Sequence, residues 1–122
     1  MCETLRVMKP GAFLFFTVPF VWPLHDVPYD EYRYTPFSLG RHLSDSGFVN
    51  VTMDALGGWD RSLAQMIGLW VRRRPMSPSQ RSFLTALAGP LVQWLNRKDT
   101  PPREFAESCM ITGIAGTAHK PS

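Results

Sequence analysis

The feature that most constrains this chain is a continuous apolar run near its start, AFLFFTVPFV at residues 12–21. Phe13 to Phe16 are consecutive apolar side chains, so a strand here would carry apolar side chains on both faces. Strands of this kind are typical of parallel sheets that helices cover on both sides. The run is also far shorter than the ~20 residues that a membrane-spanning helix needs. We therefore predict an interior strand of an α/β sheet over about 12–18.

Helix signals divide the rest of the chain. Thr35 followed by Pro36 is typical of a helix start, because threonine caps the first turn and proline fits its first position. Ser77, Pro78 and Gln80 repeat this pattern and add a capping box. The expected helices, most with an apolar stripe, are 2–9, about 36–46, 62–72 and 78–97.

Two further strands complete the predicted sheet. Residues 48–56 alternate apolar and polar side chains, as an edge strand does, and a last strand is expected at about 109–118. Two strands separated by a helix form a right-handed βαβ unit with a parallel pair, and the last strand can return antiparallel between them. We predict one α/β domain over 1–122, with two parallel strands, one antiparallel strand and a helical insertion at about 59–97.

Charge and cysteine content exclude several classes of protein. The chain has a formal net charge of +3, and its three adjacent arginines at 72–74 are more typical of a solvated helix end than of a nucleic-acid footprint. We therefore expect no nucleic-acid partner. Cys2 and Cys109 are too few for a disulfide scaffold and lack zinc-site spacing. Reduced thiols are typical of a cytosolic protein, so a cytoplasmic location is expected.

The loop after the apolar strand, PLHDVPYDEYRYTP at 23–36, concentrates the candidate site residues. In open α/β sheets ligands bind outside the carboxyl ends of the strands, so this loop is placed to contact a ligand. His25 is the candidate catalytic base, because an imidazole titrates near working pH. The candidate substrate-binding residues are the charged and aromatic side chains that follow it: Asp26, Tyr29, Asp30, Tyr32, Arg33 and Tyr34.

Each of these side chains has a defined role in a binding site and a structural alternative. Asp26 or Asp30 would orient His25 or bind an acceptor hydroxyl, Arg33 would hold a carboxylate or phosphate, and the tyrosines would line a pocket. In the alternative, Asp30 and Arg33 pair with each other, and His25 caps a turn. No third ligand is spaced to join His25 and Asp26 around a metal, so no metal site is expected.

Three stretches of the sequence resemble the C-terminal part of class I S-adenosylmethionine-dependent methyltransferases. They are ETLRVMKPGAFLFFTVPF at 3–20, HDVPYDEYRYTPFSLGRHLSDSGF at 25–48 and MITGIAGTAHKP at 110–121. The second is similar to a methyltransferase type 11-like subgroup. The resemblance implies the C-terminal part of a Rossmann-like methyltransferase sheet, S-adenosylmethionine as the cofactor, and a small-molecule, lipid or glycan-precursor acceptor.

The family's main cofactor motif is missing from this sequence. Members of the family bind the cofactor through a glycine-rich turn after the first strand and an acidic residue after the second. Neither is present here, so no residue is assigned to cofactor binding, and the isolated chain is expected to be inactive. The apolar strand also predicts that the sheet is completed elsewhere, because an open apolar edge favours aggregation. We expect a truncated product or fragment, or a partner chain that completes the sheet.

The helical insertion supports a second interpretation. Trp59, Trp70 and Trp94, together with the arginines at 72–74, would form a membrane-surface element. In a methyltransferase the same helices would cover the acceptor site. The alternative to an enzyme is therefore a non-catalytic α/β module that acts as an interaction or membrane-surface partner.

Overall fold

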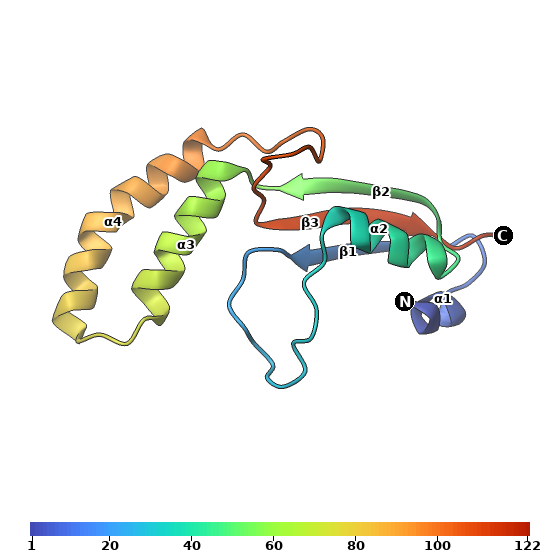
Figure 1. Cartoon of the computed structure of the whole chain (residues 1–122), viewed down its shortest axis with the longest axis horizontal. Coiled ribbons are helices and arrows are strands. Elements are labelled where there is room, and N and C mark those ends of the chain that lie inside the picture. The colour runs from blue at the N-terminus through green and yellow to red at the C-terminus, as the bar shows by residue number, and fades with distance from the viewer.

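The computed structural model describes residues 1–122 and is built around a three-stranded sheet (Figure 1). The strands are β1 (Phe13–Pro19), β2 (Val49–Leu56) and β3 (Gly113–His119). Their spatial order is β1-β3-β2, and both pairings are antiparallel. The last strand in sequence is therefore the central strand, and β1 and β2 each keep one unpaired edge.

The predicted fold class, a Rossmann-like methyltransferase sheet with two parallel strands and one antiparallel strand, is wrong. β3 separates β1 from β2, so the two strands that the intervening helix joins share no hydrogen bond, and the sheet is all-antiparallel. The physical reason lies in β3, whose small residues let both neighbours approach. A Cβ atom at Gly116 would lie 2.2 Å from the Thr52 carbonyl oxygen and 2.6 Å from the Phe16 ring.

The apolar run is buried on one face only, which corrects the expectation of an interior strand. Along β1 the side chains alternate in burial, and Phe13 and Phe15 are 65% and 63% exposed. The side chains of Leu14, Phe16 and Val18 point the other way and pack against the core. A continuous apolar sequence here therefore forms a half-buried edge strand with an exposed aromatic face.

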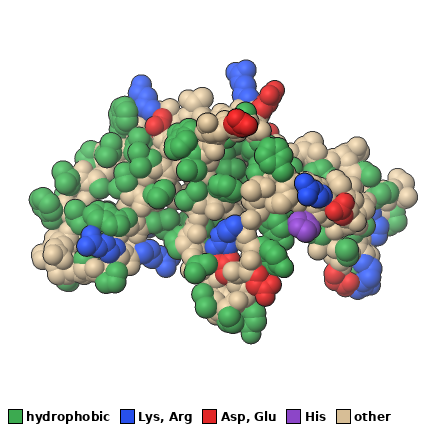
Figure 2. Space-filling model, in the orientation of Figure 1, with side chains coloured by type: hydrophobic (Ala, Val, Ile, Leu, Met, Phe, Trp, Pro, Cys, Tyr) green, Lys and Arg blue, Asp and Glu red, His purple; other side chains and the backbone are tan.

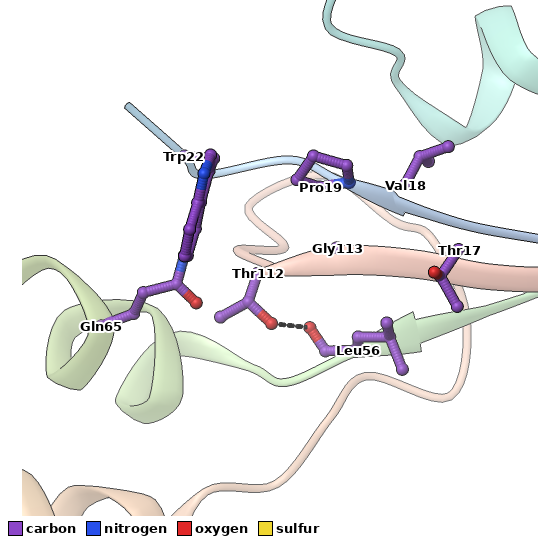
Figure 3. Close-up of a pocket in the computed structure, with 8 residues that line it drawn as sticks. All are labelled: Thr17, Val18, Pro19, Trp22, Leu56, Gln65, Thr112 and Gly113. Carbon is purple, nitrogen blue, oxygen red and sulfur yellow. Dashed lines mark hydrogen bonds between the residues drawn. The ribbon is translucent and has the colours of Figure 1, made fainter. Parts of the chain in front are cut away.

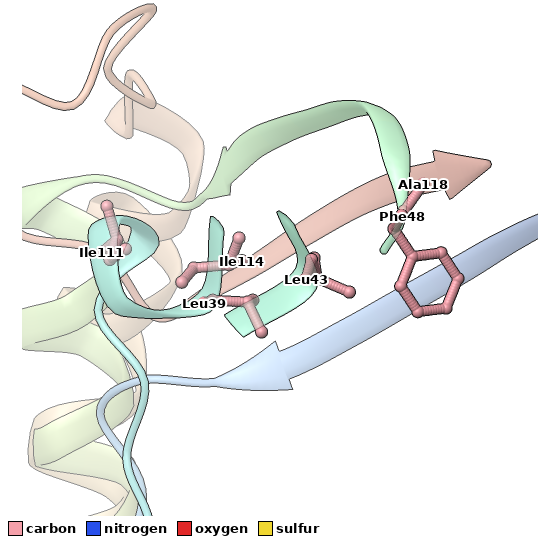
Figure 4. Close-up of a cluster of buried hydrophobic side chains, with 6 residues drawn as sticks. All are labelled: Leu39, Leu43, Phe48, Ile111, Ile114 and Ala118. Atoms are coloured by element: carbon pink, nitrogen blue, oxygen red, sulfur yellow. The ribbon is translucent and has the colours of Figure 1, made fainter. Parts of the chain in front are cut away.

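The core lies between the sheet and α2 (Pro36–Asp45) (Figure 4). Its six buried side chains are Leu39, Leu43, Phe48, Ile111, Ile114 and Ala118. The helix starts as the sequence predicts, because the Thr35 hydroxyl accepts a hydrogen bond from the Ser38 amide and Ser38 closes the capping box. Leu39 and Leu43 are one helical turn apart, which turns both toward the sheet.

A short helix, α1 (Cys2–Val7), lies at the opposite end of the sheet from the connection into the helical hairpin (Figure 1). The Lys120 ammonium donates to the carbonyls of Leu5 and Met8 at 2.9 Å each. The two ends of the chain are therefore tied together, and the cation also satisfies carbonyls at the C-terminal end of α1.

The remaining helices, α3 (Trp59–Arg73) and α4 (Pro78–Lys98), form an antiparallel hairpin that projects beyond the sheet (Figure 1). The Arg81 guanidinium closes its tip by donating to the carbonyls of Val71 at 2.6 Å and Arg72 at 2.5 Å. At its base, the Asp99 carboxylate accepts bonds from two backbone amides at the start of α3. None of the helices is long and apolar enough to cross a membrane.

We expect Gly116→Ala to lower the free energy of unfolding by about 1–3 kcal/mol, since the added methyl group would push the backbones of β3 and β2 apart. Urea denaturation followed by circular dichroism measures this loss. The matched control is Gly68→Ala in α3, where a Cβ atom meets nothing within 4 Å. The control should raise stability by about 0.5–1 kcal/mol, as alanine does inside a helix. Equal stability of the two variants would contradict the central position of β3.

Candidate functional site

The loop between β1 and α2, residues 20–35, is held closed by one ion pair. The Asp30 carboxylate accepts hydrogen bonds from both terminal nitrogens of Arg33, one of them at 2.5 Å, and from the His25 backbone amide at 3.1 Å. Arg33 also donates to the Pro23 carbonyl at 3.2 Å. These bonds connect the first half of the loop, at Pro23 and His25, to its second half, at Asp30 and Arg33. The Asp30 side chain is only 6% exposed.

The electrostatics of this pair follow from its geometry. The Arg33 guanidinium, with a further contribution from the His25 backbone amide, lowers the pKa of Asp30 from 3.8 to about 2. The same contact raises the pKa of Arg33. Both groups stay charged at neutral pH, and each uses its hydrogen bonds inside the loop. The structure thus pairs these two predicted substrate-binding residues with each other.

His25 lies beside the same carboxylate. Its Nδ1 atom is 3.9 Å from Asp30 Oδ2, and its side chain is about half exposed, at 52%. Asp26, the other predicted partner of His25, is exposed and has a positive φ of 55°. The structure therefore puts Asp30, and not Asp26, in position to orient the imidazole. The free part of the ring faces solvent, where it can exchange a proton.

Two of the three tyrosines of the loop stack on each other, and none of the three lines the cavity described below. Tyr32 and Tyr34 stack with ring centroids 6.0 Å apart, and Tyr34 meets His42 edge-on at 5.6 Å. Tyr34 also packs against the core, whereas Tyr29 and Tyr32 are largely exposed. This arrangement anchors the loop to α2 and leaves two phenol rings free on its surface.

A shallow, open cavity of about 320 Å³ lies at the carboxyl ends of β1 and β2, where the loop leaves the sheet (Figure 3). Its lining comes from both strand ends, the start of β3 and one turn of α3: Thr17, Val18, Pro19, Trp22, Leu56, Gln65, Thr112 and Gly113. None of the predicted site residues lines it. The Trp22 indole and the Gln65 side chain stand at its outer side (Figure 3).

Most polar groups of the cavity wall already have partners. The Gln65 side-chain amide donates to the Val21 carbonyl, and the Thr112 hydroxyl donates to the Leu56 carbonyl at 2.6 Å. The cavity therefore presents apolar side chains and an indole face, with no charged side chain among its lining residues. Such a lining suits an uncharged ligand with an apolar or aromatic body.

Sequence reasoning missed these lining residues because the cavity joins distant segments. Trp22 was the one local signal, since a large aromatic residue directly follows the strand. Gln65 and Thr112 are close to Val21 and Leu56 only because α3 and β3 fold back on this end of the sheet. No periodicity in the sequence specifies that contact.

The residues present do not fit S-adenosylmethionine in the way the methyltransferase family binds it. β1 is followed by Phe20 and Val21 and not by glycines. The glycine turn after β2 leads into α3, but the Asp99 carboxylate occupies its Gly58 amide at 3.0 Å. A Cβ atom at Gly58 would also lie 2.5 Å from the Thr100 carbonyl oxygen. The chain's own residues thus fill the one glycine turn that resembles a phosphate or carboxylate site.

No group of three or more metal-ligating side chains comes together in the fold. Comparisons of the chain with protein-family models, curated proteins and solved structures give no match.

We expect Asp30→Asn to open the loop, because the amide cannot replace the carboxylate between Arg33 and the His25 amide. Limited proteolysis should cut residues 23–34 faster in this variant while the thermal transition of the core stays nearly unchanged. Asp26→Asn is the matched control, since Asp26 makes no side-chain hydrogen bond and asparagine tolerates a positive φ. Equal cleavage of the two variants would show that the ion pair does not hold the loop.

The same ion pair predicts a pH dependence of loop order. The pKa of Asp30 is lower in the folded protein, at about 2, than the ordinary 3.8, so the carboxylate stabilises the closed loop fully above the ordinary value. This stabilisation should disappear as the pH falls from about 4 toward 2. Carbonyl-detected NMR of the Asp30 side chain measures the midpoint. A midpoint near the ordinary value would mean that Arg33 is not paired with it.

Proposed function

We propose that this chain binds the methyl acceptor of an S-adenosylmethionine-dependent methyltransferase, with the cofactor held by polypeptide outside these 122 residues. The proposal rests on one structural observation, which is that the cavity and the loop lie at the same end of β1. Both begin at the carboxyl end of β1, where Trp22 lines the cavity and His25 follows three residues later. The three stretches that resemble the family include this strand end and the whole loop.

The site residues divide into one that acts on the acceptor and two that position it. Methylation of a hydroxyl or amine requires that the acceptor lose a proton, and the exposed imidazole of His25 is the loop's candidate to receive it. The Asp30 Oδ2 atom lies 3.9 Å from His25 Nδ1 and is placed to orient the imidazole. Arg33 keeps Asp30 charged and fixes the loop. It is thus a positioning residue and does not bind the substrate.

The cavity indicates the kind of acceptor. It has no charged lining residue, and one wall is the Trp22 indole. A small molecule or lipid with an apolar or aromatic body would fill it, whereas a sugar-rich molecule would leave its hydroxyls without partners. The reactive hydroxyl or amine would point out of the cavity toward the loop that carries His25.

We also propose that the protein is cytoplasmic and that a partner chain binds to the edge of its sheet. Cys2 and Cys109 are both free thiols, which supports a cytoplasmic location. The outer edge of β1 is unpaired, so its free backbone groups can accept a strand from another polypeptide. That edge is where we expect the cofactor-binding partner to attach.

We expect no measurable binding of S-adenosylmethionine by the 122-residue chain in isothermal titration calorimetry. The reason is that Asp99 and Thr100 occupy the one glycine turn that resembles a cofactor site. Under the same conditions, an apolar phenol should shift the NMR signals of the Trp22 indole and the Gln65 side-chain amide. Tight cofactor binding would show that the division of the site between two polypeptides is wrong.

The activity itself is tested by isotope labelling of the source cells. Cells fed methionine with a deuterated methyl group transfer that label to every methylated product, and mass spectrometry compares wild-type cells with cells that lack this gene. We expect at least one labelled small molecule or lipid to disappear and to return on complementation. Identical labelling in the two strains would exclude the proposed function.

Complementation with variants tests the role of His25. His25→Ala should lower formation of the labelled product by about 10²–10⁴-fold, the usual contribution of a positioned base. His119→Thr is the control, because His119 pairs with Phe13 at the opposite end of the sheet and threonine is favourable in a strand. Unchanged labelling with His25→Ala would remove His25 from the reaction.

A further inference from the structure

The hairpin of α3 and α4 exposes two apolar stripes. In each helix, large apolar side chains recur every three or four residues and are between 46% and 68% exposed. They are Trp59, Leu63, Met66 and Trp70 in α3, and Phe83, Leu87, Leu91 and Trp94 in α4. Eight such side chains on two adjacent helices are more than the scattered single exposures that soluble proteins normally carry.

The two stripes lie on the same face of the hairpin. Ala64 and Val71 in α3 and Leu95 in α4 are buried and mark the line where the helices meet. At 100° per residue, the stripe is rotated from that line by about 120° in α3 and about 85° in α4, in the same helical sense. Because the helices run antiparallel, rotations of the same sense place both stripes on one side. Figure 2 shows hydrophobic side chains gathered over the hairpin part of the visible face.

The hairpin also carries the positive charge of the molecule. Residues 61–98 contain no Asp or Glu, and their cations are Arg61, Arg72, Arg73, Arg74, Arg81, Arg97 and Lys98. The whole chain has a formal net charge of only +3, so the rest of the molecule is net acidic. This asymmetry separates a basic, apolar hairpin from an acidic sheet and loop.

Most of these cations have no acidic partner. The Arg81 guanidinium donates hydrogen bonds to backbone carbonyls at the hairpin tip. The Arg61 Nε atom lies 3.8 Å from Asp99 Oδ2. The other five form no ion pair, and the Arg74 guanidinium sits 5.3 Å from the Trp70 ring centroid. Free cations therefore lie at both ends of the hairpin beside exposed indoles.

We propose that this face of the hairpin docks onto the surface of an anionic phospholipid bilayer. A bilayer surface offers acyl chains to the apolar stripes and lipid phosphates to the arginines, so it matches both properties together. A nucleic acid would satisfy only the cations and would leave the eight apolar side chains exposed. A protein partner would have to present an apolar surface with an acidic rim. The Trp–Arg contact is typical of side chains at a lipid headgroup boundary.

The docking does not depend on the proposed methyl transfer, but it has a consequence for it. Gln65 of α3 lines the cavity at the end of the sheet, so the base of the hairpin adjoins the acceptor site. At 100° per residue, Gln65 lies about 140° around α3 from Trp70, so the cavity opens on a different side of the helix from the docked face. Docking through the stripes therefore leaves the cavity accessible.

Vesicle flotation with the 122-residue chain tests the docking. We expect it to float with vesicles that contain phosphatidylglycerol at least tenfold more than with pure phosphatidylcholine, and to be released at high salt because the lipid charge is screened. Brominated lipids should quench the tryptophan fluorescence of the bound wild-type chain. Equal partitioning to neutral vesicles, or no flotation, would overturn the proposal.

Paired variants locate the contact. Trp70→Ser with Trp94→Ser, and separately Arg73→Gln with Arg74→Gln, should each lower binding about tenfold or more. Phe37→Ser is the control, because Phe37 is more exposed than either tryptophan but lies on α2 away from the basic hairpin. Circular dichroism confirms that each variant is folded.

Other occupants of this face give different results. Competition by RNA as strong as that by anionic vesicles would replace the bilayer with a nucleic acid. A concentration-dependent dimer that the Trp70→Ser and Trp94→Ser variant abolishes, without vesicle binding, would replace it with a second copy of the chain. Either result contradicts the proposal, and so does variant binding equal to that of the Phe37→Ser control.

Discussion

The close approach of the β2 backbone and the Phe16 ring to Gly116 is the constraint on which the rest of the structure depends. There, β3 passes between the Thr52 carbonyl and the Phe16 ring with no room for a Cβ atom. Because β3 pairs antiparallel with both neighbours, β1 and β2 point the same way and end at the same edge of the sheet. The cavity, the loop that carries His25 and the base of the helical hairpin all lie at that edge. The small residue at Gly116 permits the central position of β3, which brings these features to one edge.

Local features of the sequence predicted local structure well. The cap at Thr35 and the capping box at Ser77 both form, because each needs only side chains three residues apart. The alternation at 48–56 correctly indicated an edge strand. The antiparallel return of the last strand between the other two was also predicted, whereas the parallel pair of β1 and β2 was wrong. The strands that do pair lie about 60 to 100 residues apart, and no local pattern in the sequence specifies such a contact. The run of phenylalanines led to the wrong prediction of an interior strand. Such a run indicates that a strand forms, but it does not indicate whether one or both faces of the strand are buried.

The candidate site shows the same division between local and distant contacts. Asp30 and Arg33 are three residues apart, and their pairing was one of the alternatives that the sequence left open. The cavity was not predictable, because Trp22, Gln65 and Thr112 come together only after the sheet and hairpin have formed. The ion pair and the cavity differ in chemistry as well. In the loop, Asp30 and Arg33 pair with each other, and His25 remains half exposed. The cavity has no charged lining residue.

The distribution of charge connects these two regions. The sheet, the loop and the chain ends together are net acidic, whereas residues 61–98 hold seven cations and no acid. In an electric field such as that of an anionic surface, this separation orients the molecule before any contact forms. The hairpin would turn toward the surface and the acidic loop away from it. The cavity lies at the junction of the two, where Gln65 of α3 meets the end of β1. Its lining carries no charge from either region, and this property favours an apolar acceptor.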